Sequence, residues 1–208
     1  MSVQEMKNKS TVIGLTGGIA CGKSMISAYL AQKGIPVIDG DLVARQIVEP
    51  GTKGLAQIVD TFGAEYLHAD GTLNRALLGS LVFADKEALQ QLNAITKPLL
   101  LEAFKTQINA LQAHPMIVLD VALLLEDHDY KELADQVWVV TVSPAQQLAR
   151  LMKRNSYTVE EAQNRINAQM SNEERIQYAD VVIDNNGTMS ETIARVERLL
   201  YNILVSIQ

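Results

Sequence analysis

The chain has 208 residues, of which 48% are apolar and 20% charged, with a formal net charge of −6 and one cysteine. This is enough for one domain with a sizeable core, into which subdomains can be inserted. The acidic balance argues against a dedicated nucleic-acid binder, and a single cysteine excludes an intrachain disulfide and a cysteine-based zinc site. Residues 1–10 are polar, and no apolar run approaches the ~18 residues of a membrane span. We therefore expect a soluble, cytoplasmic protein.

The first informative segment is a glycine-rich loop between a predicted strand and a predicted helix. An apolar run from Val12 to Leu15 leads into Gly17-x-x-x-x-Gly22-Lys23-Ser24, and a helical pattern follows. This order is that of a P-loop: glycines turn the backbone N–H groups toward phosphates, lysine reaches the β- and γ-phosphates, and serine holds Mg²⁺. The residues expected to bind ATP here are Gly17, Gly18, Ile19, Ala20, Cys21, Gly22, Lys23, Ser24 and Met25, with Lys23 also catalytic.

Two aspartates follow the next short apolar strand, residues 36–38. A carboxylate at a strand tip beside a phosphate loop can accept the proton of an attacking alcohol, so we predict that Asp41 is the catalytic base. The alternative is that Asp41 caps the helix expected from Leu42 to Val48. Asp39 either organises Mg²⁺ through water or satisfies loop amides.

Residues 52–112 contain no convincing strand and show four apolar stripes at helical spacing. The third stripe, from Leu89 to Ile95, is expected to end at Pro98, and a fourth begins at Leu100. Such a helical segment between two strands of a parallel sheet predicts a substrate-holding insertion. Arg45, one helical turn after Asp41, and Arg75 are its candidate phosphate ligands, and each has the alternative of a solvated surface position.

Two further buried strands are expected at residues 116–120 and 137–142, and a last one at 180–184. Asp120 follows four apolar residues, as a Mg²⁺-binding acid would, although this pattern is common in buried strands. Ser143-Pro144 and Thr158-x-x-Glu161 predict the starts of two helices. Cys21 is either a reactive thiol at a helix N-terminus or, as we favour, a packing residue.

Short motifs follow one another in a specific order from residue 14 to residue 187. They are Gly14 to Ile19 running into Gly22-Lys23-Ser24, Ile38 to Asp41 with Ala44-Arg45, Leu73-Asn74-Arg75, Leu78-Gly79, Val82-Phe83, Leu92-Asn93 before Pro98, Leu123-Leu124 with Glu126, residues 147–154, Arg165-Ile166 with Gln169, and residues 179–187. This set resembles the dephospho-coenzyme A kinase family over nearly the whole chain. The phosphate loop alone would indicate only a nucleotide.

The resemblance implies an α/β P-loop NTPase fold of the nucleoside-monophosphate-kinase type, with a parallel core sheet, a helical substrate-binding insertion and a helical lid. It implies transfer of the γ-phosphoryl of ATP, with Mg²⁺, to the ribose 3′-hydroxyl of dephospho-coenzyme A. The second acid of the family's Asp-x-Asp motif corresponds to Asp41. The corresponding segments are a core of 11–41, 115–145 and 178–208, an insertion of 42–112, and a lid of 146–177.

The resemblance also implies further site residues. Arg150 and Asn186 are expected at the nucleotide, and Asp41, Arg45, Arg75, Lys97 and Arg165 at the substrate. The chain departs from the family at Ala20, usually glycine, at Cys21, usually serine or threonine, at Lys97, usually histidine, and at Ala122, usually proline. We expect ATP binding to survive these changes, because neither Ala20 nor Cys21 supplies the lysine or the Mg²⁺ ligand.

Two other functions remain open from the residues alone. A kinase for nucleoside monophosphates would share the same core and differ in what residues 42–112 hold. A GTP-binding switch would need an Asn-Lys-x-Asp sequence after a late strand, and the chain has none; Asp60-x-x-Gly63 lies in a helical stripe. We expect no nucleic-acid or membrane partner, and a monomer or a weak homo-oligomer.

Overall fold

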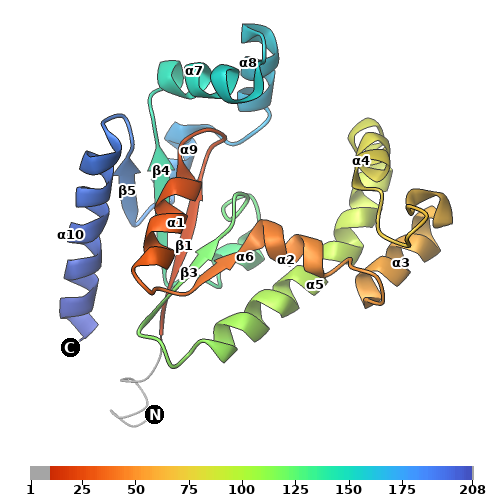
Figure 1. Ribbon diagram of the computed structural model, residues 1–208, viewed down its shortest axis with the longest axis horizontal. Helices are drawn as coiled ribbons and strands as arrows, with labels where there is room; N and C mark the ends of the chain where they lie inside the picture. The colour runs from red at the N-terminus through yellow and green to blue at the C-terminus, as the bar shows by residue number, and fades with distance from the viewer. Residues whose placement is uncertain (1–9, 208) are drawn as a thin grey trace. The chain divides into compact units, whose positions relative to one another are not determined.

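The structure, a computed structural model, describes residues 10–207. Its centre is a five-stranded sheet in the order β2-β3-β1-β4-β5 (Figure 1). The strands are β1 (Thr11–Gly17), β2 (Val37–Asp39), β3 (Met116–Asp120), β4 (Gln136–Thr141) and β5 (Val181–Asp184). β1 pairs in parallel with both β3 and β4, and β4 pairs in parallel with β5. The apolar runs of the sequence thus form the predicted parallel sheet.

Helices connect these strands. They are α1 (Lys23–Gln32), α2 (Gly40–Gln46), α3 (Lys53–Phe62), the short 3-10 helix η2 (Ala64–Tyr66), α4 (Arg75–Ala84), α5 (Lys86–Ala110), α6 (His128–Lys131), α7 (Pro144–Asn155), α8 (Val159–Asn167), α9 (Asn172–Gln177) and α10 (Met189–Ile207). The predicted starts of α7 and α8 are confirmed: the Ser143 hydroxyl caps α7, and Thr158 and Glu161 form a capping box on α8.

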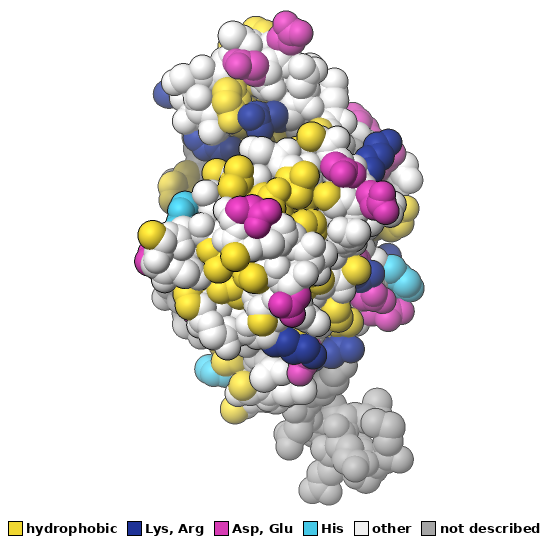
Figure 2. All heavy atoms as spheres, turned by 90° about the vertical axis from the view of Figure 1, so that its right-hand side faces the viewer, with side chains coloured by type: hydrophobic (Ala, Val, Ile, Leu, Met, Phe, Trp, Pro, Cys, Tyr) yellow, Lys and Arg dark blue, Asp and Glu magenta, His cyan; other side chains and the backbone are white. Residues whose placement is uncertain are grey.

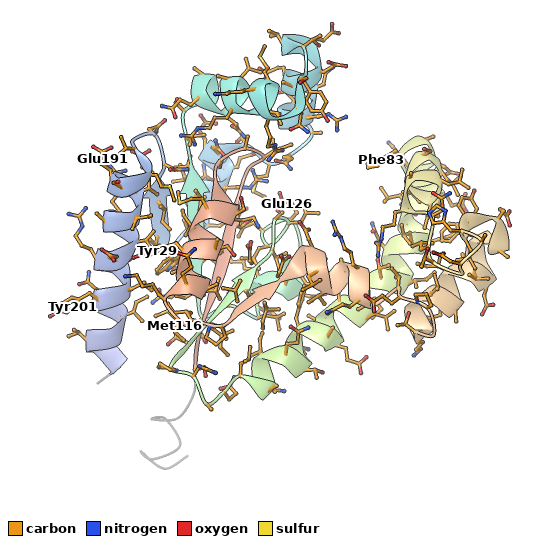
Figure 3. The ribbon with its side chains drawn as sticks, viewed as in Figure 1. Tyr29, Phe83, Met116, Glu126, Glu191 and Tyr201 are labelled. Atoms are coloured by element: carbon orange, nitrogen blue, oxygen red, sulfur yellow. The ribbon has the colours of Figure 1, made fainter. Side chains whose placement is uncertain are left out.

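Apolar side chains of the central strands are withdrawn from solvent on both faces of the sheet. Val139 of β4, on one face, is 0% exposed, and so are Ile13 of β1 and Trp138 of β4, on the other face. Helices α1 and α10 contribute Leu30 and Val196 to the same buried cluster. The two helices also meet through a hydrogen bond of 2.5 Å from the Tyr29 hydroxyl to a Glu197 oxygen, and Figure 3 shows Tyr29 on α1. This packing holds α1, and so the loop that precedes it, against the sheet.

The chain divides into two compact units, one of residues 1–38 and 108–208 and one of residues 39–107. The second unit is helical apart from an isolated bridge between Leu67 and Leu73. Its core contains Val48, Ile58 and Leu78, which are buried. On the side formed by α3 and α4, acidic, basic and hydrophobic side chains are interspersed (Figure 2).

The expected helix break at Pro98 is wrong. Helix α5 runs through it without interruption from Lys86 to Ala110, 25 residues in all. A proline inside a helix removes one hydrogen bond and costs about 3 kcal/mol. Apolar side chains are packed on both sides of Pro98: Leu92 before it and Phe104, which is 1% exposed, after it. This burial offsets the cost of the proline.

No helix between residues 10 and 207 is long and apolar enough to cross a membrane.

Candidate active site

The loop between β1 and α1 has the backbone geometry of a phosphate cradle. Strand β1 ends at Gly17, where an added Cβ would lie 2.6 Å from the carbonyl oxygen of Val140. Gly22, which precedes α1, has φ 93°, and Ala20 has φ 62°. These left-handed residues turn the backbone, and the free N–H groups of the first turn of α1 add the positive end of the helix. An anion at this position is therefore favoured.

Lys23, the first residue of α1, forms an ion pair with Asp120, the last residue of β3. The Lys23 side chain is 19% exposed and that of Asp120 is 8% exposed. The carboxylate thus holds the ammonium group of Lys23 beside the loop. Ser24 follows directly and is exposed, so its hydroxyl could contribute a ligand to a Mg²⁺ ion.

The segment after β5 supports the loop through Asn185. The buried Asn185 side chain donates from Nδ2 to the carbonyl of Cys21 at 2.8 Å and accepts from the Thr192 hydroxyl at 2.9 Å. Arg150 of α7 donates to the Asn185 carbonyl at 2.9 Å. Asn186 is exposed, and its Oδ1 accepts from the backbone N–H of Ser143 at 2.8 Å. The predicted residue Arg150 is therefore linked to the loop through Asn185, whereas Asn186, the next residue, bonds to Ser143 just before α7.

Cys21 lies inside the loop with 0% exposure. Burial raises the pKa of its thiol, and the hydrogen bonds and the Arg175 charge nearby only partly oppose this effect. A neutral thiol in an apolar position is a packing residue, as the sequence favoured, and not an activated nucleophile.

Asp39 and Asp41 have different roles at the start of α2. The Asp39 side chain accepts from the backbone N–H groups of Asp41 and Leu42, at 2.8 and 3.1 Å. Asp39 is therefore the N-cap, and the helix begins at Gly40. The alternative that Asp41 caps a helix starting at Leu42 is wrong, because the cap lies two residues earlier. The exposed Asp41 carboxylate makes no hydrogen bond or ion pair within the part of the chain that the structure describes.

Arg45 and Arg75 lie together in the second unit. Arg75 donates from a guanidinium nitrogen to the carbonyl of Arg45 at 3.2 Å. Burial lowers the pKa of Arg75, and the positive charge of Arg45 lowers it further. Arg75 also lines a cavity of about 230 Å³ whose other walls are mainly apolar, among them Ile47 and Leu92. The two adjacent arginines, Arg45 and Arg75, favour an anionic ligand. Lys97, the third cation predicted in this unit, lies on α5 and is partly buried.

Arg165 lies on α8, where its guanidinium stacks over the Tyr157 ring at 4.6 Å. Arg154 of α7 donates to the Asn155 side chain at 2.8 Å. Surface ion pairing is the alternative role for such arginines, but neither forms an ion pair with Glu160, Glu161 or Glu173 among residues 10–207. Both side chains are exposed and are therefore accessible to a ligand that approaches from solvent.

Sequence reasoning missed an ion pair beside the loop in which the arginine is buried. Arg175 of α9 is 1% exposed and donates to Glu126 at 2.6 Å and to the Met170 carbonyl at 2.5 Å. Its guanidinium lies 3.2 Å from where a Cβ on Gly18 would stand, so a side chain at Gly18 has no room. Figure 3 shows Glu126 on the loop after β3. Glu126 carries part of the family motif, but nothing in the sequence pairs it with Arg175.

This P-loop, at the carboxyl edge of a parallel sheet with added helices, defines a P-loop kinase. Similar solved structures agree. One from Thermus thermophilus, called TT1252, has a TM-score of 0.79 at 28% identity and covers 93% of this chain and 98% of that one. A dephospho-CoA kinase from Campylobacter jejuni has a TM-score of 0.72 at 26% identity, covering 92% and 96%. A shikimate kinase from Bacteroides thetaiotaomicron, at 17% identity and a TM-score of 0.54, shares the fold alone.

The sequence comparisons are more specific. The family model described as dephospho-CoA kinase matches residues 11–191. A protein of that name from Shouchella clausii is 47% identical over 186 residues, 88% of this chain and 94% of the relative. Another from Listeria monocytogenes is 47% identical over 184 residues, 86% and 90%. The chain therefore belongs to the dephospho-CoA kinase family, and it is an ATP-dependent phosphotransferase.

Proposed function

We propose that this chain transfers the γ-phosphoryl group of ATP to the ribose 3′-hydroxyl of dephospho-coenzyme A. The observation that carries the proposal is the P-loop, whose left-handed Gly22 and Ala20 lead into Lys23 in a chain that belongs to this family. A nucleoside monophosphate as acceptor is the alternative, and the family membership disfavours it.

On the nucleotide side, the loop amides and Lys23 bind the phosphates. Lys23 exchanges its Asp120 partner for the β- and γ-phosphates, whose charge it neutralises during transfer. The Ser24 hydroxyl fits a Mg²⁺ ion, because it is exposed at the first turn of α1, next to the phosphates; the ion would shield the charge of the triphosphate. Arg150 and the Asn186 segment, which are joined through Asn185, border the nucleotide.

On the acceptor side, Asp41 acts as the general base. The supporting observation is that Asp39 alone caps α2, which leaves the Asp41 carboxylate without a structural partner in the described chain. Asp41 takes the proton of the 3′-hydroxyl as its oxygen bonds to the γ-phosphorus, and the bond from that phosphorus to the β–γ bridging oxygen breaks to release ADP. Arg45, Arg75, Lys97 and Arg165 hold the anionic groups of the substrate.

In this proposal residues 11–41, 115–145 and 178–208 form the core, residues 42–112 hold the substrate and residues 146–177 form a lid. We expect the enzyme to work in the cytoplasm as a monomer or weak homo-oligomer, without a nucleic-acid partner. Light scattering of the purified protein, with and without substrates, measures its oligomeric state.

The decisive experiment is acceptor-dependent ADP release by the wild type and by Asp41→Asn. We expect Asp41→Asn to lose about 10²–10⁴-fold in kcat while it still binds ATP. Asp60→Asn, at an exposed position of α3 in the same unit, is the matched control and should keep full activity. Wild-type protein that turned over a nucleoside monophosphate and ignored dephospho-coenzyme A would refute the proposed acceptor. Full activity of Asp41→Asn would refute the base.

A further inference from the structure

Two glutamines bind both backbone groups of one residue in the P-loop. The N–H of Ile19 donates to Oε1 of Gln169 at 2.8 Å, and the carbonyl of Ile19 accepts from Nε2 of Gln147 at 2.9 Å. Gln147 lies on α7 and is 4% exposed; Gln169 lies between α8 and α9 and is partly buried. The two contacts are 128 and 150 residues apart in sequence. The segment from α7 to α9 thus holds the main chain of the loop at Ile19.

The orientation of the Gln147 amide is fixed by its other neighbour. Asn172 of α9 donates from Nδ2 to Oε1 of Gln147 at 3.1 Å and to the carbonyl of Val142 at 3.2 Å. The Oε1 of Gln147 is therefore the acceptor, and its Nε2 is left to face Ile19. The Sγ of Cys21 donates to Oδ1 of Asn172 at 3.8 Å. This chain of hydrogen bonds begins in the loop at Cys21 and returns to it at Ile19.

The loop needs such support because Ala20, the residue after Ile19, has φ 62°. A left-handed conformation is unfavourable for a residue with a Cβ and persists only where its surroundings determine it. The N–H and the carbonyl of Ile19 belong to the peptide bonds on its two sides. Fixing both groups fixes the entry of the chain into Ala20 and so the direction of the amides that follow.

We propose that Gln147 and Gln169 are positioning residues, which hold the two peptide bonds of Ile19 so that the loop is shaped for ATP before the nucleotide arrives. This inference rests on the proposed use of the loop for ATP. It adds a role for α7 and for the α8–α9 connection: their uncharged side chains Gln147 and Gln169 set the affinity for the nucleotide through the main chain of Ile19.

The test variant is Gln169→Leu, which has a similar volume but cannot accept from the Ile19 N–H. Gln163→Leu is the matched control, because Gln163 is an exposed residue of α8 whose side chain, among residues 10–207, bonds only to Asn167, at 2.8 Å. Calorimetry with Mg–ATP and no acceptor should show about tenfold weaker binding for Gln169→Leu, the effect of losing a partly buried hydrogen bond. Gln163→Leu should bind like the wild type. Because no acceptor is present, failure of the proposed acceptor leaves this result unaffected.

Two readouts separate positioning from general damage. In steady-state assays the KM for ATP should rise in Gln169→Leu while the KM for the acceptor stays unchanged. In the wild type without nucleotide, the Ile19 amide should be protected from hydrogen exchange, and Gln169→Leu should remove that protection. An unprotected Ile19 amide in the wild type overturns the inference whether or not the variant folds. So does ATP affinity in Gln169→Leu equal to that of the control.

Discussion

The Nζ of Lys23 is paired with Oδ1 of Asp120, which joins the start of α1 to the end of β3. The pair is more than four-fifths buried at both side chains, which are 19% and 8% exposed. A buried ammonium group must keep an anionic partner, since an unpaired one is costly. Phosphate oxygens in the loop would supply that partner, so nucleotide binding and the position of Lys23 are coupled.

We predict that Lys23→Met lowers kcat for phosphoryl transfer by about 10²–10³-fold, the size found when one charge-stabilising group is removed. Initial-rate assays with saturating ATP measure the loss. Lys33→Met is the control, because Lys33 lies after α1 and its ion pair with Glu197 is about half exposed, at 49% and 51%. Equal rates for Lys23→Met and Lys33→Met would contradict the assigned role of Lys23.

A second prediction concerns Asn185. Asn185→Leu leaves the Cys21 carbonyl and the Thr192 hydroxyl without this partner in a buried place. We expect a loss of about 1–3 kcal/mol in the free energy of unfolding, a fall of roughly 2–4 °C in Tm per kcal/mol, and weaker ATP binding. Thermal unfolding followed by circular dichroism measures the first two quantities. Asn155→Leu, at the exposed end of α7, is the control; a variant at Asn185 as stable as that control would show that the bond is dispensable.

A third prediction follows from the raised pKa of Cys21. Because burial favours the neutral thiol in the folded state, its contribution to stability is complete below the unfolded pKa of 9.0 and is lost as the pH rises above that value. Urea titrations from about pH 7 to about pH 10 should therefore show a falling free energy of unfolding, and Cys21→Ala should flatten part of that slope. Iodoacetamide should modify native Cys21 far more slowly than the urea-unfolded chain. Equal rates of modification would contradict its burial.

A fourth prediction concerns acid stability and the capping boxes of α8 and α9. Backbone hydrogen bonds from Thr158 and Ser171 lower the pKa values of Glu161 and Glu174 below the unfolded value of 4.5. The stability that these carboxylates contribute is present above pH 4.5 and is lost as the pH falls through the folded pKa values. Glu174→Gln should weaken this dependence in urea titrations between about pH 6 and about pH 3. Glu173→Gln, at the exposed neighbouring position, should retain it, and identical slopes would contradict the prediction.

The elements that the sequence predicts well are those whose signal is local. The apolar runs at residues 12–15, 116–120 and 137–142 became buried strands because they have no polar face to expose. The P-loop could be located to the residue, since its glycines and lysine are required by geometry at a fixed spacing. The cap on α7 followed from the adjacent residues Ser143 and Pro144.

The contacts that the sequence could not supply join distant segments. Asn185 and Gln169 reach the loop from 164 and 150 residues away, and an asparagine after a strand reads equally well as a turn. Arg175 carries no sequence signal of burial, yet it is 1% exposed and forms an ion pair with Glu126. The predicted helix break at Pro98 was wrong because packing on both sides of the proline outweighed its local tendency to end a helix.

Ala20, with φ 62°, holds a left-handed conformation that glycine adopts without a steric penalty. An alanine in that conformation costs roughly 1–2 kcal/mol in the native state. A glycine there would avoid this cost. It would also increase the conformational freedom of the unfolded chain, which lowers the free energy of unfolding by about 0.4–1 kcal/mol. The net difference is about 1 kcal/mol, small beside the margin of 5–15 kcal/mol by which domains stay folded. An exchange of alanine and glycine at this position is therefore nearly neutral in free energy, provided that the neighbouring peptides keep their shape.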